Sequence, residues 1–119
     1  MLPSGFEDDN MCFACGKGNP DGLGMEFEFE GEELHTSLSF PRKFQGYRDV
    51  VHGGLVSTAL DEAMVTLLNR LGHLAVTAEL TVRFVRPVRV DERLDITARL
   101  TGRRGKIASL EARAAGPDG

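Results

Sequence analysis

The stretch HGGLVSTALDEAM, residues 52–64, combines residue types that could act on a carbonyl group. Its two glycines fall at the expected start of a helix, where backbone N–H groups lack partners and the helix dipole favours an oxyanion. At about 100° per residue, Asp61 lies at the flank of the apolar stripe, whereas Glu62 turns toward the polar side and is expected to be solvated. Asp61 is therefore the candidate that acts on a substrate. The alternative is that His52 only hydrogen-bonds backbone and that both carboxylates are helix surface.

Cys12 and Cys15 form a C-x-x-C pair inside CFACGKGNPDGLG. Zinc takes four ligands, and no second cysteine pair or HxxxH follows to complete a set. A redox pair is expected to open a helix after a strand, whereas Gly, Asn, Pro and Asp follow here. We therefore favour two small residues in a structural loop, and a redox pair or a metal shared between chains are the alternatives. The sequence by itself assigns no metal ligand.

Alternation of apolar and polar residues predicts five half-buried strands, and three-and-four spacing predicts one long helix. The strands are expected over 25–30, 34–40, 76–84, 94–100 and 108–114. The first two form a hairpin across Gly31 and Glu32, whereas residues 41–51 carry no period and are expected to be a loop. The helix is expected over 56–71, with Gly72 as its C-terminal cap. Because no other element can cover the dry face of the sheet, the pattern predicts an α+β fold in which a curved antiparallel sheet of about five strands wraps a central helix.

Length and charge limit the class of protein. A chain of 119 residues is expected to be a single domain, 1–119, which begins with a loop over residues 1–24. The net charge of −4 argues against nucleic-acid binding. A run of about 18 apolar residues and a secretory signal are both missing, so we expect no membrane contact and a cytoplasmic location. The ending AAGPDG predicts a turn and a returning strand, so either the C-terminus is truncated or a partner chain supplies that pairing.

Four stretches carry a resemblance to a known family: CFACG…NPDGLG, VVHGGLVSTALDEAM, TAELTVRFVRPV and ARLTGRRGKIASLEARA. They resemble the hot-dog fold thioesterases, and among them the phenylacetic-acid-degradation (PaaI-like) type. The most specific part is HGG followed by an acidic residue seven positions after the second glycine, which is the place of Asp61. The resemblance implies a hot-dog fold and an enzyme that hydrolyses the thioester of an acyl-coenzyme A. Coenzyme A is then part of the substrate, and no further cofactor is implied.

The resemblance also implies roles for the residues of the HGG stretch. Asp61 would be the nucleophile or the general base that activates water, two roles that the sequence does not separate. The amide of Gly54, with Gly53 as the neighbouring candidate, would polarise the thioester carbonyl. His52 would shape the turn and touch that carbonyl.

Other residues are expected to contribute to substrate binding. Some relatives use a glutamine upstream of the histidine, for which Gln45 is the candidate. Some carry Thr one turn after the acid, where this chain has Val65, and that departure puts a hydroxyl-assisted water position in doubt. The phosphates of coenzyme A call for cationic side chains, because guanidinium grips phosphate in a forked geometry. The candidates are Arg86, Arg103, Arg104 and Lys106, with a basic surface hairpin as the alternative for the GRRGK turn.

The family implies a homodimer, often a dimer of dimers, in which two sheets join edge to edge and each pocket takes residues from both chains. We therefore expect Asp61 to act with Gly54 of the neighbouring chain. Two other functions stay open. A hot-dog domain can bind acyl-coenzyme A without cleaving it. A hydratase or dehydratase of acyl thioesters ranks lower, because it needs a His–acid pair and His52 precedes the helix rather than entering such a motif.

Overall fold

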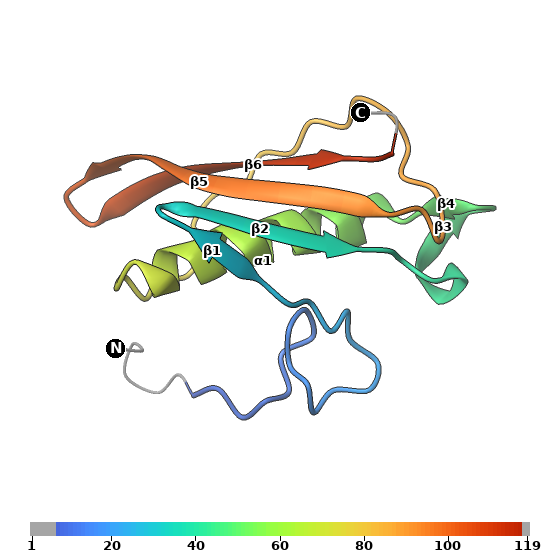
Figure 1. Ribbon diagram of the computed structural model, residues 1–119, viewed down its shortest axis with the longest axis horizontal. Helices are drawn as coiled ribbons and strands as arrows, with labels where there is room; N and C mark the ends of the chain where they lie inside the picture. The colour runs from blue at the N-terminus through green and yellow to red at the C-terminus, as the bar shows by residue number, and fades with distance from the viewer. Residues whose placement is uncertain (1–6, 118–119) are drawn as a thin grey trace.

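In the computed structural model, which describes residues 7–117, a curved antiparallel sheet packs over one long helix (Figure 1). The sheet contains β1 (Glu28–Glu30), β2 (Glu33–Leu38), β5 (Leu94–Arg104) and β6 (Ile107–Ala115), in the order β1-β2-β5-β6. The turn between β1 and β2 passes through Gly31 at φ +60, a conformation that glycine adopts without strain. Phe29 then pairs with Leu34 across the hairpin. The hairpin predicted from the alternation is confirmed.

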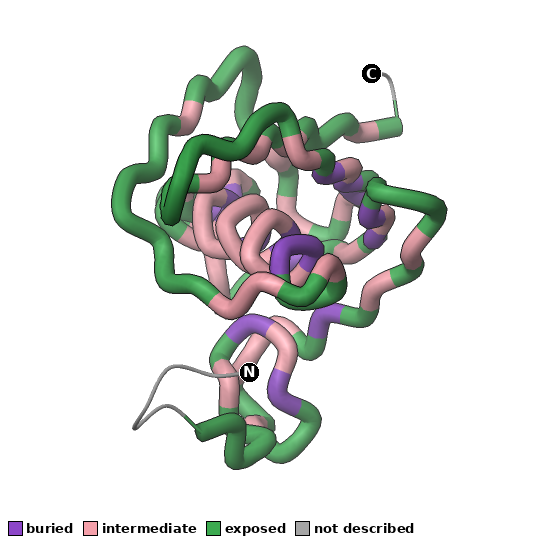
Figure 2. Tube along the Cα trace, turned by 90° about the vertical axis from the view of Figure 1, so that its left-hand side faces the viewer, coloured by how far each residue is buried: buried purple, intermediate pink, exposed green. Residues whose placement is uncertain are grey.

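The core lies between the sheet and α1 (Gly53–Arg70). The buried helix residues are Val56, Ala59, Ala63, Leu67 and Leu68, and the buried apolar residues of the sheet are Leu34, Leu94, Ile96 and Ala98. Figure 2 looks along the molecule and shows buried positions on the helix and on the chain that faces it, with exposed residues outside. One apolar stripe on the helix therefore fills the concave face of the sheet, and the predicted α+β hot-dog architecture is confirmed.

The helix ends where the sequence predicts. Gly72 has φ +93 and donates its N–H to the carbonyl of Asn69 at 3.0 Å, while the N–H of His73 reaches the carbonyl of Leu68 at 3.0 Å. These two bonds satisfy carbonyls that a helix end leaves free, and only glycine adopts the left-handed conformation cheaply. Among the described residues there is no helix with the length and apolar character needed to span a bilayer.

Residues 41–51 are more regular than the predicted loop. They contain a short 3-10 helix η1 (Arg42–Phe44) and the strands β3 (Gln45–Tyr47) and β4 (Val50–Val51), which pair with each other. The turn between them places Asp49 at φ +63, which Asp tolerates better than most residues. These strands are too short to show a period in the sequence. They lead the chain directly into the start of α1.

The strand predicted over 76–84 is wrong for this chain. Within the described residues the segment pairs with no other strand, although β1 and β6, at the two edges of the sheet, each have only one neighbour. Alternation shows that one face of a segment is apolar, but it does not supply a neighbour. The segment leaves the end of α1 and returns to β5 as an extended trace in Figure 1. Its large apolar side chains stay outside the core, with Val76 64% and Phe84 53% exposed.

The β5–β6 hairpin is longer than its neighbours. The pairing of β2 with β5 stops at Arg99, whereas β5 and β6 stay paired as far as Arg104 and Ile107. A register shift lies between Leu100 and Gly102, at the beginning of this unsupported part. The strands predicted over 94–100 and 108–114 are therefore confirmed but extended. The turn predicted near the C-terminus falls partly on residues 118–119, which lie outside the described residues.

Candidate active site

The corner at the start of α1 is organised by His52. Its backbone N–H donates to the carbonyl of Phe44 at 2.9 Å, and its carbonyl accepts from Leu55 at 2.9 Å. Its ring Nδ1 accepts the N–H of Gly54 at 3.0 Å and so caps the helix. The expected role of His52 in shaping this turn thus has a direct geometric basis. The same bond means that the Gly54 amide, the expected donor to a carbonyl, already has a partner inside the chain.

An open hollow of about 420 Å³ lies at this corner. It is lined by Lys43, Phe44, Gln45, His52, Gly54 and Leu55, and we call it the entrance hollow. The structure thus brings Gln45, His52 and Gly54 together, as the sequence led us to expect. The carbonyl of the Gln45 side chain also accepts the N–H of Asp49 at 3.2 Å, which holds it against the β3–β4 turn. Lys43 was missed by the sequence analysis, although the basic pair before Gln45 could have indicated it.

Asp61 lies farther along α1 and is half-buried. It follows Gly54 by seven residues, which corresponds to about 10 Å along a helix axis. Its Oδ1 accepts the hydroxyl of Thr77 at 2.6 Å, so the segment after the helix orients the carboxylate. Val65 is also half-buried and lies one turn beyond. A single chain therefore does not bring Asp61 and Gly54 to one reacting atom.

The segment that returns to β5 covers the beginning of α1. A Cβ at Gly53 would lie 3.3 Å from the ring of Phe84, so this aromatic side chain packs on the first helical residue. The carbonyl of Val88 accepts the N–H of Val51 at 2.9 Å, which ties the same segment to β4. Arg86 lies between these contacts and is exposed. It is the predicted phosphate-binding residue that this chain places at the same end as the entrance hollow.

The remaining cationic candidates lie elsewhere. Arg103 donates to Nε2 of His73 at 2.6 Å, and His73 follows the C-terminal end of α1. Arg104 and Lys106 sit beside it at the tip of the β5–β6 hairpin and are exposed. An 18-residue helix is about 27 Å long, so this cluster is at the opposite end of α1 from the entrance hollow. Within one chain Arg103 and Arg104 therefore lie far from His52, and their role in phosphate binding stays a prediction.

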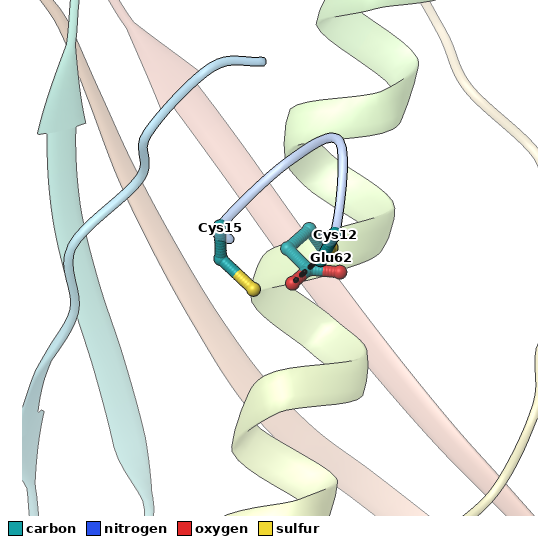
Figure 3. A group of neighbouring side chains, drawn as sticks. All are labelled: Cys12, Cys15 and Glu62. Carbon is teal, nitrogen blue, oxygen red and sulfur yellow. Dashed lines mark hydrogen bonds between the residues drawn. The ribbon is translucent and has the colours of Figure 1, made fainter. Parts of the chain in front are cut away.

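Glu62 is not the solvated residue that its helical angle predicted. The described part of the N-terminal loop, residues 7–24, passes on the side of α1 away from β5 and β6 in Figures 1 and 2, and Glu62, which it contacts, is half-buried. The thiol of Cys12 donates to Oε2 of Glu62 at 3.7 Å (Figure 3). Burial, followed by the hydrogen bond with Glu62, raises the pKa of the Cys15 thiol far above its usual value. Helical periodicity was insufficient here because it does not include a loop that arrives from elsewhere in the sequence.

The family comparison gives the class of protein. A family model described as the thioesterase superfamily matches residues 49–118, so the chain belongs to this superfamily. A search of curated proteins gave no significant match.

Solved structures share the fold. A thioesterase superfamily protein superimposes with a TM-score of 0.78 at 23% identity over 83% of this chain and 52% of its own, so the chain spans about half its length. The E. coli PaaI protein from the phenylacetic acid degradation operon gives a TM-score of 0.74 at 18% identity, covering 81% of this chain and 70% of its own. A hypothetical thioesterase protein from Streptococcus pneumoniae, solved with coenzyme A, gives 0.74 at 17% identity, with 80% and 77% covered. The resemblance to PaaI-like hot-dog thioesterases is confirmed.

Proposed function

We propose that this protein hydrolyses the thioester of an acyl-coenzyme A. One observation carries the proposal: in a chain of the thioesterase superfamily, Gly54 and Leu55 at the start of α1 line a hollow together with Gln45 and His52. Backbone N–H groups at a helix start stabilise the negative charge that develops on a thioester carbonyl oxygen. The coenzyme A in the Streptococcus pneumoniae structure supports the same ligand class.

In the proposed reaction the thioester carbonyl lies in the entrance hollow and accepts the N–H of Gly54, displacing the ring of His52. Asp61 either takes a proton from a water that attacks the carbonyl carbon, or attacks that carbon itself to form an acyl anhydride, which a water then hydrolyses to regenerate the carboxylate. The carbon–sulfur bond breaks, the sulfur leaves as the coenzyme A thiolate and takes up a proton, and the acyl group is released as the free acid. Lys43 and Arg86, at the same end of α1, supply positive charge for the phosphates.

The active unit in this proposal contains two copies of the chain. Asp61 and Gly54 of one chain are separated by about 10 Å along the helix, so each site takes the carboxylate from one protomer and the amide from its partner. The unpaired segment over 76–85 supports this arrangement, because Val76 is 64%, Phe84 53% and Val85 84% exposed. An extended segment with free backbone groups and apolar side chains is suited to pairing with a second sheet edge. Assembly into a dimer of dimers and a cytoplasmic location stay predictions.

The first experiment measures thiol release from benzoyl-coenzyme A and from a medium-chain acyl-coenzyme A. Asp61→Asn keeps the shape of the side chain and removes its charge, so we expect turnover to fall at least a hundredfold, as for loss of a group that acts on the reacting bond. Asp95→Asn is the matched control, because Asp95 is an exposed carboxylate on the outer face of β5. Wild-type turnover in Asp61→Asn contradicts the assignment of the carboxylate.

The second experiment tests the shared site. Gly54→Pro removes the amide hydrogen in the first helical turn, where proline is tolerated. Asp61→Asn and Gly54→Pro are each expected to be inactive, but after equal mixing and re-association half of the dimers carry one site with both native groups. About one quarter of wild-type activity should therefore return. Failure of mixed dimers to recover activity places both groups in the same chain and refutes the shared arrangement.

A second candidate function is acyl-coenzyme A binding without cleavage. It is favoured by one observation, namely that the Gly54 amide already donates to His52. Equilibrium binding of the substrates above with no thiol release, in a protein that dimerises, would assign this function instead.

A further inference from the structure

Three potential metal ligands meet between the N-terminal loop and α1. The Sγ atoms of Cys12 and Cys15 and a carboxylate oxygen of Glu62 all lie within 4.8 Å of one another. Figure 3 shows the three side chains pointing toward the same point, two from the loop and one from the helix. The distance from Cys12 Sγ to Glu62 Oε2 is 3.7 Å. Tetrahedral zinc with a thiolate and a carboxylate ligand requires a sulfur–oxygen separation of about 3.6 Å, so this pair is already at the distance that a shared metal requires.

The loop that carries the cysteines is held in place by its own backbone. Gly16 donates to the carbonyl of Cys12 at 2.8 Å, and Leu23 and Met25 donate to the carbonyls of Phe13 and Ala14 at 2.7 and 2.9 Å. A Cβ at Gly16 would overlap the main chain of Asn10 and Cys12, so glycine is required for this close approach. The backbone that carries the two cysteines is therefore held in place before any ligand binds, which lowers the entropy cost of binding.

The chemistry of these three groups selects the metal. Without a cation the thiol of Cys15 stays protonated, because burial and the neighbouring carboxylate raise its pKa. A divalent cation offsets the charge of two thiolates and one carboxylate and makes their ionised forms favourable. Two thiolates favour zinc over magnesium or calcium, which prefer oxygen ligands. The sequence analysis missed this set because the third ligand is 47 residues from Cys15.

We propose that Cys12, Cys15 and Glu62 bind one Zn²⁺, whose fourth position is taken by water or by a non-protein ligand. The metal fastens the N-terminal loop onto α1, and this site goes beyond the thioesterase activity proposed above.

The site also connects to the entrance hollow. Phe13 lies between the two cysteines in the sequence, and its ring packs edge-on against Phe44, with ring centroids 6.3 Å apart. Phe44 lines the entrance hollow and packs edge-on against the buried Phe40 at 6.4 Å. Metal binding therefore fixes one wall of the hollow through Phe13. This consequence for substrate rests on the proposed function, whereas metal binding itself does not.

The test uses the reduced, metal-free full-length chain titrated with Co²⁺, which substitutes for zinc and reports thiolate ligands through its charge-transfer absorption. We expect one Co²⁺ per chain, its displacement by Zn²⁺, and a higher thermal midpoint in the loaded wild type. Cys12→Ser and Cys15→Ser should lose the thiolate band. Glu62→Gln should keep a weaker band and lose at least tenfold in affinity, the smallest effect expected for a metal-site residue.

Asp61→Asn is the matched control, because it changes the adjacent carboxylate on the same helix. It should bind Co²⁺ like the wild type even though it is expected to lose thioester hydrolysis, so failure of the two proposals can be told apart. Circular dichroism checks that each serine variant keeps its helix. A reduced wild type without a cobalt–thiolate band overturns the proposal, as does undiminished affinity in Cys15→Ser. Undiminished affinity in Glu62→Gln removes Glu62 from the ligand set.

Discussion

Replacement of His52 should reveal how much the helix start depends on one side chain. The ring of His52 accepts the Gly54 N–H at 3.0 Å and is the side-chain cap of α1. Loss of such a cap costs about 0.5–2 kcal/mol of protein stability. His52 is exposed, so water competes for the same amide, and we expect His52→Ala to cost about 0.5–1 kcal/mol. For a chain of this size about 1 kcal/mol corresponds to a fall of roughly 4 °C in Tm.

His52→Asn separates capping from other effects of removing the ring. Asparagine is among the best N-cap residues, so this variant should recover most of the stability lost in His52→Ala. Both variants and the wild type are compared by urea unfolding followed by circular dichroism, because α1 carries one half of the core. Equal stability of the three proteins would refute the capping assignment. An asparagine variant less stable than the alanine variant would show that the ring contributes through packing instead.

Three further changes test other parts of the structure. Leu67→Ala should lower the free energy of unfolding by about 2–5 kcal/mol in urea titrations, because Leu67 is 0% exposed, whereas Leu80→Ala, at a 40% exposed position, should have little effect. Thr77→Val removes the hydroxyl that holds Asp61, so kcat for thioester hydrolysis should fall about fivefold with KM nearly unchanged, and an unaltered kcat contradicts this role. In the metal-free protein the raised pKa of Cys15 keeps its thiol protonated after the unfolded chain ionises near 9.0, so stability should decrease above that pH. The slope should be well below the ceiling of about 1.4 kcal/mol per pH unit, since the thiol is partly solvated, and it should be absent in Cys15→Ala.

The local sequence pattern was sufficient to predict the elements in which apolar residues repeat regularly over a long stretch. The hairpin around Gly31, the helix with its Gly72 cap and the β5–β6 hairpin were predicted from alternation, three-and-four spacing and glycine positions. These signals work because each element turns one apolar face to the same core. The corner of the candidate site was also predictable, because the HGG stretch, the helix start and Gln45 are neighbours in sequence.

Contacts between distant segments were not predictable from one sequence. The strand expected over 76–84 has the correct alternation but no neighbour within the chain, since pairing depends on the whole sheet. Glu62 has the helical angle of a solvated residue, yet a loop from 50 residues earlier covers it. Likewise, the sequence does not show that the entrance hollow contains Gly54 but not Asp61, which lies about 10 Å farther along α1.

The part of the β5–β6 hairpin beyond Arg99 extends past the rest of the sheet. It has one neighbouring strand instead of two, and the irregular pairing between Leu100 and Gly102 gives it a place to flex. Bending there would break the hydrogen bond between Arg103 and His73, whereas Leu94, Ile96 and Ala98 would stay packed in the core. Amide exchange should therefore be faster in this part of the hairpin than where β5 lies between β2 and β6.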